Sequence, residues 1–252
     1  MAIDLANIVK TREIGPPRVL LYAPHGIGKT TLGASTSDPI FLLTEDGLGV
    51  LEVPHFPLAQ SFADVMQAIG ALYEQKHEYQ TVVLDSADWL EGLIVAEVER
   101  KHDAKELAYG KGAVIAAGYW KQVLEGLNAL RNDRNMVVLM LAHCQIKRFD
   151  SPEVEPYDRY QPKLQDRSSA LVQEWADAVL FANYKTIVKK DDVGFNNAVR
   201  RGITTGERLL YATEKPAFYA KNRYALPDSM PMSWSSLVGA IDAAIQPAAA
   251  AA

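Results

Sequence analysis

The residues best suited to chemistry lie in one stretch near the N-terminus, V-L-L-Y-A-P-H-G-I-G-K-T-T-L at 19–32. Residues 23–30 match the phosphate-binding pattern G-x-x-x-x-G-K-[ST], except that Ala23 replaces the first glycine. The glycines let the backbone fold so that successive amide N–H groups converge on a phosphate ahead of a helix. The stretch therefore predicts a binding site for a nucleoside triphosphate and Mg²⁺.

Each position of this loop has an expected role. Lys29 should reach the β- and γ-phosphates, Thr30 should bind Mg²⁺ through its hydroxyl, and Thr31 should meet the α-phosphate. Ala23 demands an ordinary backbone conformation, which we expect to loosen the loop without abolishing binding. The remaining nucleotide contacts are expected from Pro24, His25, Gly26, Ile27 and Gly28. The alternative is a glycine-rich turn with a chance lysine, which the apolar strand before it and the helical pattern after it disfavour.

Acidic residues follow two short apolar runs further along the chain. Asp85 comes directly after the run 81–84, where a carboxylate can hold Mg²⁺; the alternative is a residue that caps the strand end. Glu45 follows the run 40–44 and is the predicted base that orients or deprotonates water. Asp46 is the neighbour that could take this role, and Glu45 could instead be a solvated loop residue. Ser86, and not a glutamate, follows Asp85, which favours Glu45.

Two further sets of polar residues could contact the phosphates. His143 ends the apolar run 136–142 and is the predicted sensor of the γ-phosphate, with Gln145 as the alternative and a core histidine as the simpler interpretation. Lys221 and Arg223 alternate on a predicted strand and would therefore point to the same face. They could form a phosphate clamp, including one on the nucleotide of an adjacent subunit. A solvated strand face is the competing interpretation.

Alternating strands and helices must position these residues. Short apolar runs predict buried parallel strands, and the intervening segments have helical spacing, so the pattern indicates a doubly wound α/β sheet. After residue 185 the pattern changes to short strands with turns, which predicts a small antiparallel C-terminal extension. Segments 101–112 and 144–166 are expected to be loops. The expected strands are 19–22, 40–44, 81–84, 136–142 and 178–184, and the expected helices are 30–35, 62–75, 88–100, 114–131, 168–175 and 234–245.

Composition is that of an ordinary globular protein: 252 residues, of which 48% are hydrophobic and 23% charged. The single cysteine, Cys144, excludes an internal disulfide. An early Asp4 and the lack of a long apolar run argue against a signal peptide or membrane span, so we expect a cytoplasmic protein. Residues 1–140 carry 12 Lys and Arg against 18 Asp and Glu, whereas 141–252 carry 14 against 13. A contact with a polyanion is therefore expected mainly in the later half.

Five segments together resemble a known family. A-P-H-G-I-G-K-T-T, L-L-T-E-D-G, V-V-L-D-S, L-M-L-A-H-C-Q and A-K-N-R-Y resemble the RecA-like P-loop ATPase core. More narrowly, they resemble the phage nucleotide-binding proteins that include Sak-type single-strand annealing recombinases. The resemblance spans 17–226, which leaves 1–16 as an N-terminal segment and 227–252 as a C-terminal helix and tail. It implies that Glu45 is catalytic and that His143 is the γ-phosphate sensor.

The same resemblance implies partners. The K-N-R segment is similar to K-N-R-F-G of RadA/Sms and to the related DnaB segment, whose cations reach a neighbour's ATP, although Tyr224-Ala225 replaces Phe-Gly here. This implies a homo-oligomer with ATP between adjacent subunits. In the family, loops corresponding to 101–113 and 144–167 contact DNA, so single-stranded DNA is the expected partner and a single-strand-binding protein a further candidate.

We expect basic residues of these two loops to meet DNA phosphates while tyrosines stack on bases. The basic residues are Lys105, Lys111, Lys147, Arg148, Arg159 and Lys163, and the tyrosines are Tyr109, Tyr157 and Tyr160. Two other functions remain open. One is a DnaB- or RadA-like DNA motor, and the other is a nucleotide-switched protein-binding module without a DNA role, which the acidic net charge of −5 favours.

Overall fold

The computed structural model describes residues 15–192 and 198–245. The strands are β1 (Arg18–Ala23), β2 (Pro39–Leu43), β3 (Thr81–Asp85), β4 (Val137–Phe149), β5 (Tyr157–Pro162), β6 (Ala178–Asp192), β7 (Ala198–Tyr211), β8 (Lys221–Asn222) and β9 (Ser229–Pro231). The helices are α1 (Lys29–Ala34), α2 (Phe62–Glu74), α3 (Ala87–Lys101), the 3₁₀ turn η2 (Ala108–Gly110), α4 (Lys111–Asp133), α5 (Asp166–Trp175) and α6 (Trp234–Ile245).

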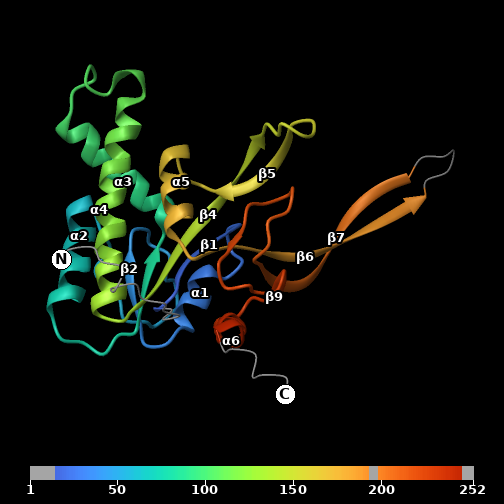
Figure 1. Cartoon of the computed structure of the whole chain (residues 1–252), viewed down its shortest axis with the longest axis horizontal. Helices are drawn as coiled ribbons and strands as arrows, with labels where there is room; N and C mark the ends of the chain where they lie inside the picture. Colours follow the sequence, from blue (N-terminus) through green and yellow to red (C-terminus); the bar gives the residue numbers. More distant parts are fainter. Residues whose placement is uncertain (1–14, 193–197, 246–252) are drawn as a thin grey trace, which may run out of the picture.

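Within the described residues, the strands form one mixed sheet with the order β2-β3-β4-β1-β6-β7-β9; β5 pairs with β4, and β8 with β6 (Figure 1). Strands β2, β3, β4, β1 and β6 run parallel to one another. Strands β7 and β8 are antiparallel to β6, and β9 is antiparallel to β7. The expected fold class, a mostly parallel sheet with an antiparallel C-terminal extension, is confirmed.

Both faces of the parallel sheet are buried because alternate side chains of each strand point to opposite faces. One face, which includes Leu20 and Met140, packs against α2, α3, α4 and α5. The other, which includes Leu21 and Leu141, packs against α1 and α6 through Leu32 and Trp234. This double covering explains why the strands appear in the sequence as wholly apolar runs.

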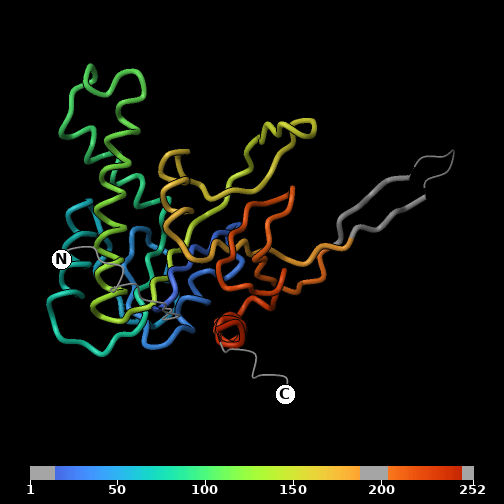
Figure 2. Tube along the Cα trace, in the orientation of Figure 1, coloured from blue at the N-terminus to red at the C-terminus, as the bar shows by residue number. Residues whose placement is uncertain are grey.

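Two segments expected to be loops contain regular structure. Segment 144–166 holds the end of β4 and all of β5, which form a hairpin with Ile146 opposite Tyr160 and Phe149 opposite Tyr157. These cross-strand pairs stabilise the hairpin, although its prolines and charges favoured a loop. Segment 101–112 holds η2 and the first residues of α4, so α3 and α4 form an arm. Figure 2 shows this arm and the hairpin as two projections on the same side of the molecule.

The helices otherwise match expectation within one to three residues at each end. Helix α2 begins after Ser61, whose hydroxyl accepts a hydrogen bond from the Asp64 amide at 3.2 Å, as its capping role predicts. Strands β6 and β7 are longer than expected and form a two-stranded ribbon. Among the described residues, no helix is long and apolar enough to cross a membrane.

Candidate nucleotide site

The loop between β1 and α1 has the backbone that phosphate binding requires. Gly26 and Gly28 have φ values of 73° and 102°, in the left-handed region that favours glycine. Ala23 ends β1, is fully buried, and pairs with His143 of β4. Because Ala23 belongs to the strand and lies before the turn, a methyl group is accommodated at the position where the pattern has its first glycine.

The structure brings three of the expected phosphate and metal residues together. Thr30 donates a hydrogen bond from Oγ1 to Oδ2 of Asp85 at 2.8 Å. Lys29 is buried, and its Nζ donates to the Ala23 and Pro24 carbonyls at 3.4 and 3.3 Å. Burial lowers the pKa of Lys29, and the carboxylates of Asp85 and Glu45 act in the opposite direction. The ammonium group therefore lies inside the loop, beside two acids.

Asp85 is suited to holding a cation. It is 1% exposed, and its Oδ1 has no hydrogen-bond partner within the described residues. Burial raises the pKa of this carboxyl group, while the Thr30 hydroxyl opposes the shift. The unsatisfied oxygen beside a threonine hydroxyl fits Mg²⁺, a hard cation that prefers oxygen ligands. Clusters of three or more His, Cys, Asp or Glu side chains suited to a metal do not occur in the described parts, so phosphate oxygens and water would have to complete the shell.

Glu45 and His143 lie at the same edge of the sheet. The Ser86 hydroxyl donates to Oε2 of Glu45 at 3.2 Å, and this oxygen lies 3.8 Å from Nδ1 of His143. The strand ends are held together because the Thr44 hydroxyl donates to the Ser86 carbonyl and accepts from the Ser86 amide, at 2.7 and 2.8 Å. Asp46 is exposed to solvent. Glu45, and not Asp46, therefore faces Ser86 and His143.

Sequence reasoning missed Asp88, in the first turn of α3. Its carboxylate lies 3.0 Å from Nδ1 of His143 and accepts the His143 backbone N–H at 3.0 Å. Burial acts to raise the pKa of Asp88, but the hydrogen bonds from His143 outweigh it and hold the pKa below its usual value. The ring of His25 stacks on that of His143 at 3.9 Å. The neighbouring imidazole of His143 lowers the pKa of His25, and burial adds a smaller contribution in the same direction.

Arg208 was also missed. It lies on β7, and its Nη1 donates to the Ile27 carbonyl at 3.0 Å. A Cβ atom added to Gly28 would lie 2.7 Å from the same nitrogen, so the guanidinium group lies directly against the phosphate loop. The sequence signal for Asp88 is its place three residues after Asp85, at the start of the expected helix 88–100. We find none for Arg208, which is far from the loop along the chain.

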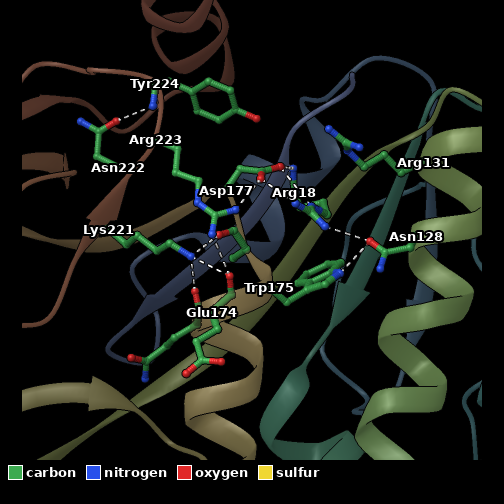
Figure 3. A network of polar contacts seen from close by, with 12 residues as sticks. Arg18, Asn128, Arg131, Glu174, Trp175, Asp177, Lys221, Asn222, Arg223 and Tyr224 are labelled. Carbon is green, nitrogen blue, oxygen red and sulfur yellow. Dashed lines mark hydrogen bonds and ion pairs between the residues drawn. The ribbon is translucent and has the colours of Figure 1, made fainter. Parts of the chain in front are cut away.

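Lys221 and Arg223 lie in a polar network at the beginning of β6 (Figure 3). This is the end of the parallel strands opposite to the phosphate loop. Lys221 Nζ donates to the carbonyls of Gln173, Glu174 and Ala176 at the end of α5, at 2.7–2.8 Å. Arg223 pairs with Asp177 at 3.3 Å, and Asp177 also binds Arg18 at 2.7 Å. Both side chains therefore bind groups of the same chain. Their contact with a neighbour's nucleotide stays a prediction, and it would require these bonds to break.

This capping arrangement makes Lys221→Met a test of stability. Loss of the ammonium group leaves three carbonyls at the end of α5 without their donor, and we expect the free energy of unfolding to fall by roughly 1–3 kcal/mol. Chemical denaturation measures this change, with Lys121→Met on exposed α4 surface as the matched control. Equal midpoints for the two variants would show that the cap contributes nothing.

The residues expected to bind DNA lie on the two projections. Lys105, Lys111 and the fully exposed Tyr109 lie at the tip of the α3–α4 arm. Tyr157 and Tyr160 are partly buried and pack against Phe149 and Phe181. On and beside the hairpin, basic residues lie close to acids: Lys147 with Asp166, Arg148 with Asp150, Arg159 with Glu214 and Lys163 with Asp88.

A groove of about 770 Å³ lies between α3 and the base of the hairpin, next to Asp88. Lys147, Lys163 and Glu91 contribute to its lining. Gln145, the alternative sensor, also lines it, and its Nε2 donates to the Pro162 and Leu164 carbonyls at 3.2 and 3.3 Å. Gln145 therefore supports the base of the hairpin, and His143 is the better placed of the two beside the phosphate loop.

Comparison with known proteins places this site in a family. A family model described as an AAA domain matches residues 15–224, which include the phosphate loop and all three acidic or imidazole strand ends. The chain belongs to this AAA domain family. Membership, together with the loop geometry, supports an NTPase. The narrower resemblance to Sak-type phage proteins stays a prediction.

Among solved structures, the AAA domain is similar to the RadB recombinase. The two chains share 14% sequence identity over 78% of this chain and 80% of that chain, with a TM-score of 0.44. A search of curated proteins found no match.

Proposed function

We propose that this AAA domain protein is an ATPase that binds ATP with Mg²⁺ at the phosphate loop and acts on single-stranded DNA in recombination or annealing. The observation that carries the proposal is the hydrogen bond between Thr30 and Asp85 beside the buried Lys29. It joins the loop to the acidic end of β3, which is the arrangement needed to hold the phosphates and their metal.

In this proposal the loop amides and Lys29 bind the phosphates, while Thr30 and Asp85 hold Mg²⁺. When bound, Mg²⁺ neutralises charge on the phosphate oxygens. Glu45 orients the attacking water and accepts its proton, for which its half-buried carboxylate beside Ser86 is suited. His143, whose ring stacks on that of His25 in the loop, lies beside the γ-phosphate end of the site and the attacking water.

Two observations support a DNA role for the projections. Tyr109 is fully exposed at the arm tip between two lysines, and an exposed aromatic ring among cations suits a nucleobase and its phosphate. The hairpin begins directly beyond His143, because β4 continues into it. A change at the γ-phosphate could therefore reach the hairpin along a single strand.

The test is ATP hydrolysis by the full chain with and without single-stranded DNA, together with particle sizing and a gel shift at low salt. We expect hydrolysis, stimulation by DNA and an oligomeric particle. The variant Lys105→Glu with Lys111→Glu should weaken DNA binding and flatten its salt dependence, because two phosphate contacts are lost. The matched control is Lys76→Glu, at an exposed site after α2. Hydrolysis without any DNA binding would remove the DNA part of the proposal.

A second candidate is a nucleotide-switched protein-binding module. The ion pairs that Lys147, Arg148 and Arg159 form with neighbouring carboxylates favour it, because paired cations offer less charge to a polyanion. It predicts ATP binding and hydrolysis that single-stranded DNA does not change, and no retention on a DNA column.

A further inference from the structure

Asp88, in the first turn of α3, contacts both the backbone and the ring of His143. Its side chain is 4% exposed. Oδ1 accepts the His143 backbone N–H at 3.0 Å, and Oδ1 and Oδ2 lie 3.2 and 3.0 Å from the ring nitrogen Nδ1. A single buried carboxylate therefore fixes both the backbone and the ring of the same histidine.

These contacts determine where the ring carries a proton. An ionised carboxylate can only accept hydrogen bonds, so the nitrogen that faces it must be protonated. The low pKa of Asp88 keeps the group ionised. Nδ1 therefore carries a proton, and Nε2 is the nitrogen left without a protein partner in the described residues. The stacked ring of His25 holds the plane of the imidazole against the phosphate loop.

We propose that Asp88 is a positioning residue of the hydrolytic centre, which keeps the Nδ1 proton of His143 on its own side and presents the unprotonated Nε2, as a hydrogen-bond acceptor, to water at the γ-phosphate end of the bound nucleotide. The proposal rests on the proposed ATPase function. Asp88 touches neither phosphate nor water in this role, because it acts through the imidazole of His143. An orienting carboxylate behind a histidine fixes the tautomer and the direction of the ring in the same way at metal sites.

The variant Asp88→Asn tests the proposal because the backbone contact determines how the new amide sits. The Asn oxygen keeps the hydrogen bond from the His143 backbone, which leaves its NH₂ group facing Nδ1. An amide NH₂ donates, so Nδ1 should lose its proton and Nε2 should gain one. Nitrogen-15 NMR of the imidazole ring, recorded on the nucleotide-free protein, reads this exchange directly. Glu45, Lys163, Lys29 and His25 also face the site and are unchanged in the variant.

Kinetics supplies the second readout. We expect kcat for ATP to fall by about 10–100-fold with little change in KM, as at other sites where an orienting carboxylate is lost. In the background of His143→Gln the same substitution should have almost no effect, because Asp88 would have no ring to position. Asp64→Asn is the matched control, since Asp64 is likewise an acid in the first turn of a helix, α2, outside the site.

Two results would overturn the inference: a proton that remains on Nδ1 in Asp88→Asn, or equal losses of kcat with and without His143. Failure of the proposed function is distinguishable, because it would show as the absence of ATP hydrolysis in the unsubstituted protein, while the NMR readout still tests the positioning role.

Discussion

Lys29→Ala should abolish productive nucleotide binding, with hydrolysis of ATP reduced by roughly 10²-fold or more. The ammonium group lies inside the loop, within 3.4 Å of the Ala23 and Pro24 carbonyls, and the phosphates would lose their closest cation. The measurement pairs the affinity for an ATP analogue with the steady-state rate.

The substitution should change the stability of the nucleotide-free protein only slightly. Burial lowers the pKa of Lys29, which means that the folded state disfavours its charged form. Removing the group relieves this cost but takes a cation away from the buried Asp85 carboxylate, so we expect only a small change in the melting temperature. Lys76→Ala, at an exposed site, is the control for loss of a lysine. Unchanged affinity in Lys29→Ala would place the phosphate site elsewhere.

Much of the arrangement of the candidate site could be predicted because its residues follow directly from two local patterns. The phosphate loop is a contiguous motif whose backbone depends on Gly26 and Gly28. Glu45, Asp85 and His143 follow apolar runs, and parallel strands bring their carboxyl ends to one edge of a sheet. The phosphate loop and the polar strand ends can both be predicted without knowing how distant elements pack.

The contacts that depend on packing could not be predicted. Arg208 reaches Ile27 because β7 lies two strands from β1, an order that no local pattern encodes. Lys221 has the residue type of a phosphate ligand, but the antiparallel pairing of β8 with the start of β6 places it against the end of α5. The type and spacing of a basic residue therefore predict what it can bind, but not which part of the folded chain it contacts.

The hairpin that β4 and β5 form after His143 also depends on contacts across strands that no local pattern encodes. Prolines and charges in 144–166 are typical of a loop, yet the aromatic pair Phe149–Tyr157 and the pair Ile146–Tyr160 across β4 and β5 outweigh them. The result extends β4, so the strand that carries His143 is continuous with a projecting surface element. The guanidinium group of Arg159, on β5, lies over the Phe149 ring of the same hairpin at 3.8 Å and beside Glu214. Such contacts favour a rigid hairpin over a flexible DNA-binding loop.

Glu45→Gln should separate nucleotide binding from hydrolysis. The amide keeps the size of the side chain and can still contact the Ser86 hydroxyl, so we expect affinity for ATP to be retained. It cannot accept a proton from water, so hydrolysis should fall by roughly 10²-fold or more. Binding of a fluorescent ATP analogue and single-turnover hydrolysis, measured on the same preparation, check the two halves of the prediction.

The neighbouring acids make this prediction specific. Asp46→Asn changes the adjacent exposed carboxylate and should leave hydrolysis close to that of the unsubstituted protein, while Glu52→Gln controls for the loss of one negative charge in the same segment. A large loss in Asp46→Asn with normal turnover in Glu45→Gln would move the base by one residue. Normal turnover in both would exclude the segment after β2 as the source of the base. The imidazoles of His143, oriented by Asp88, and of His25, stacked on it, would then be the groups at the phosphate loop with a nitrogen able to accept the proton.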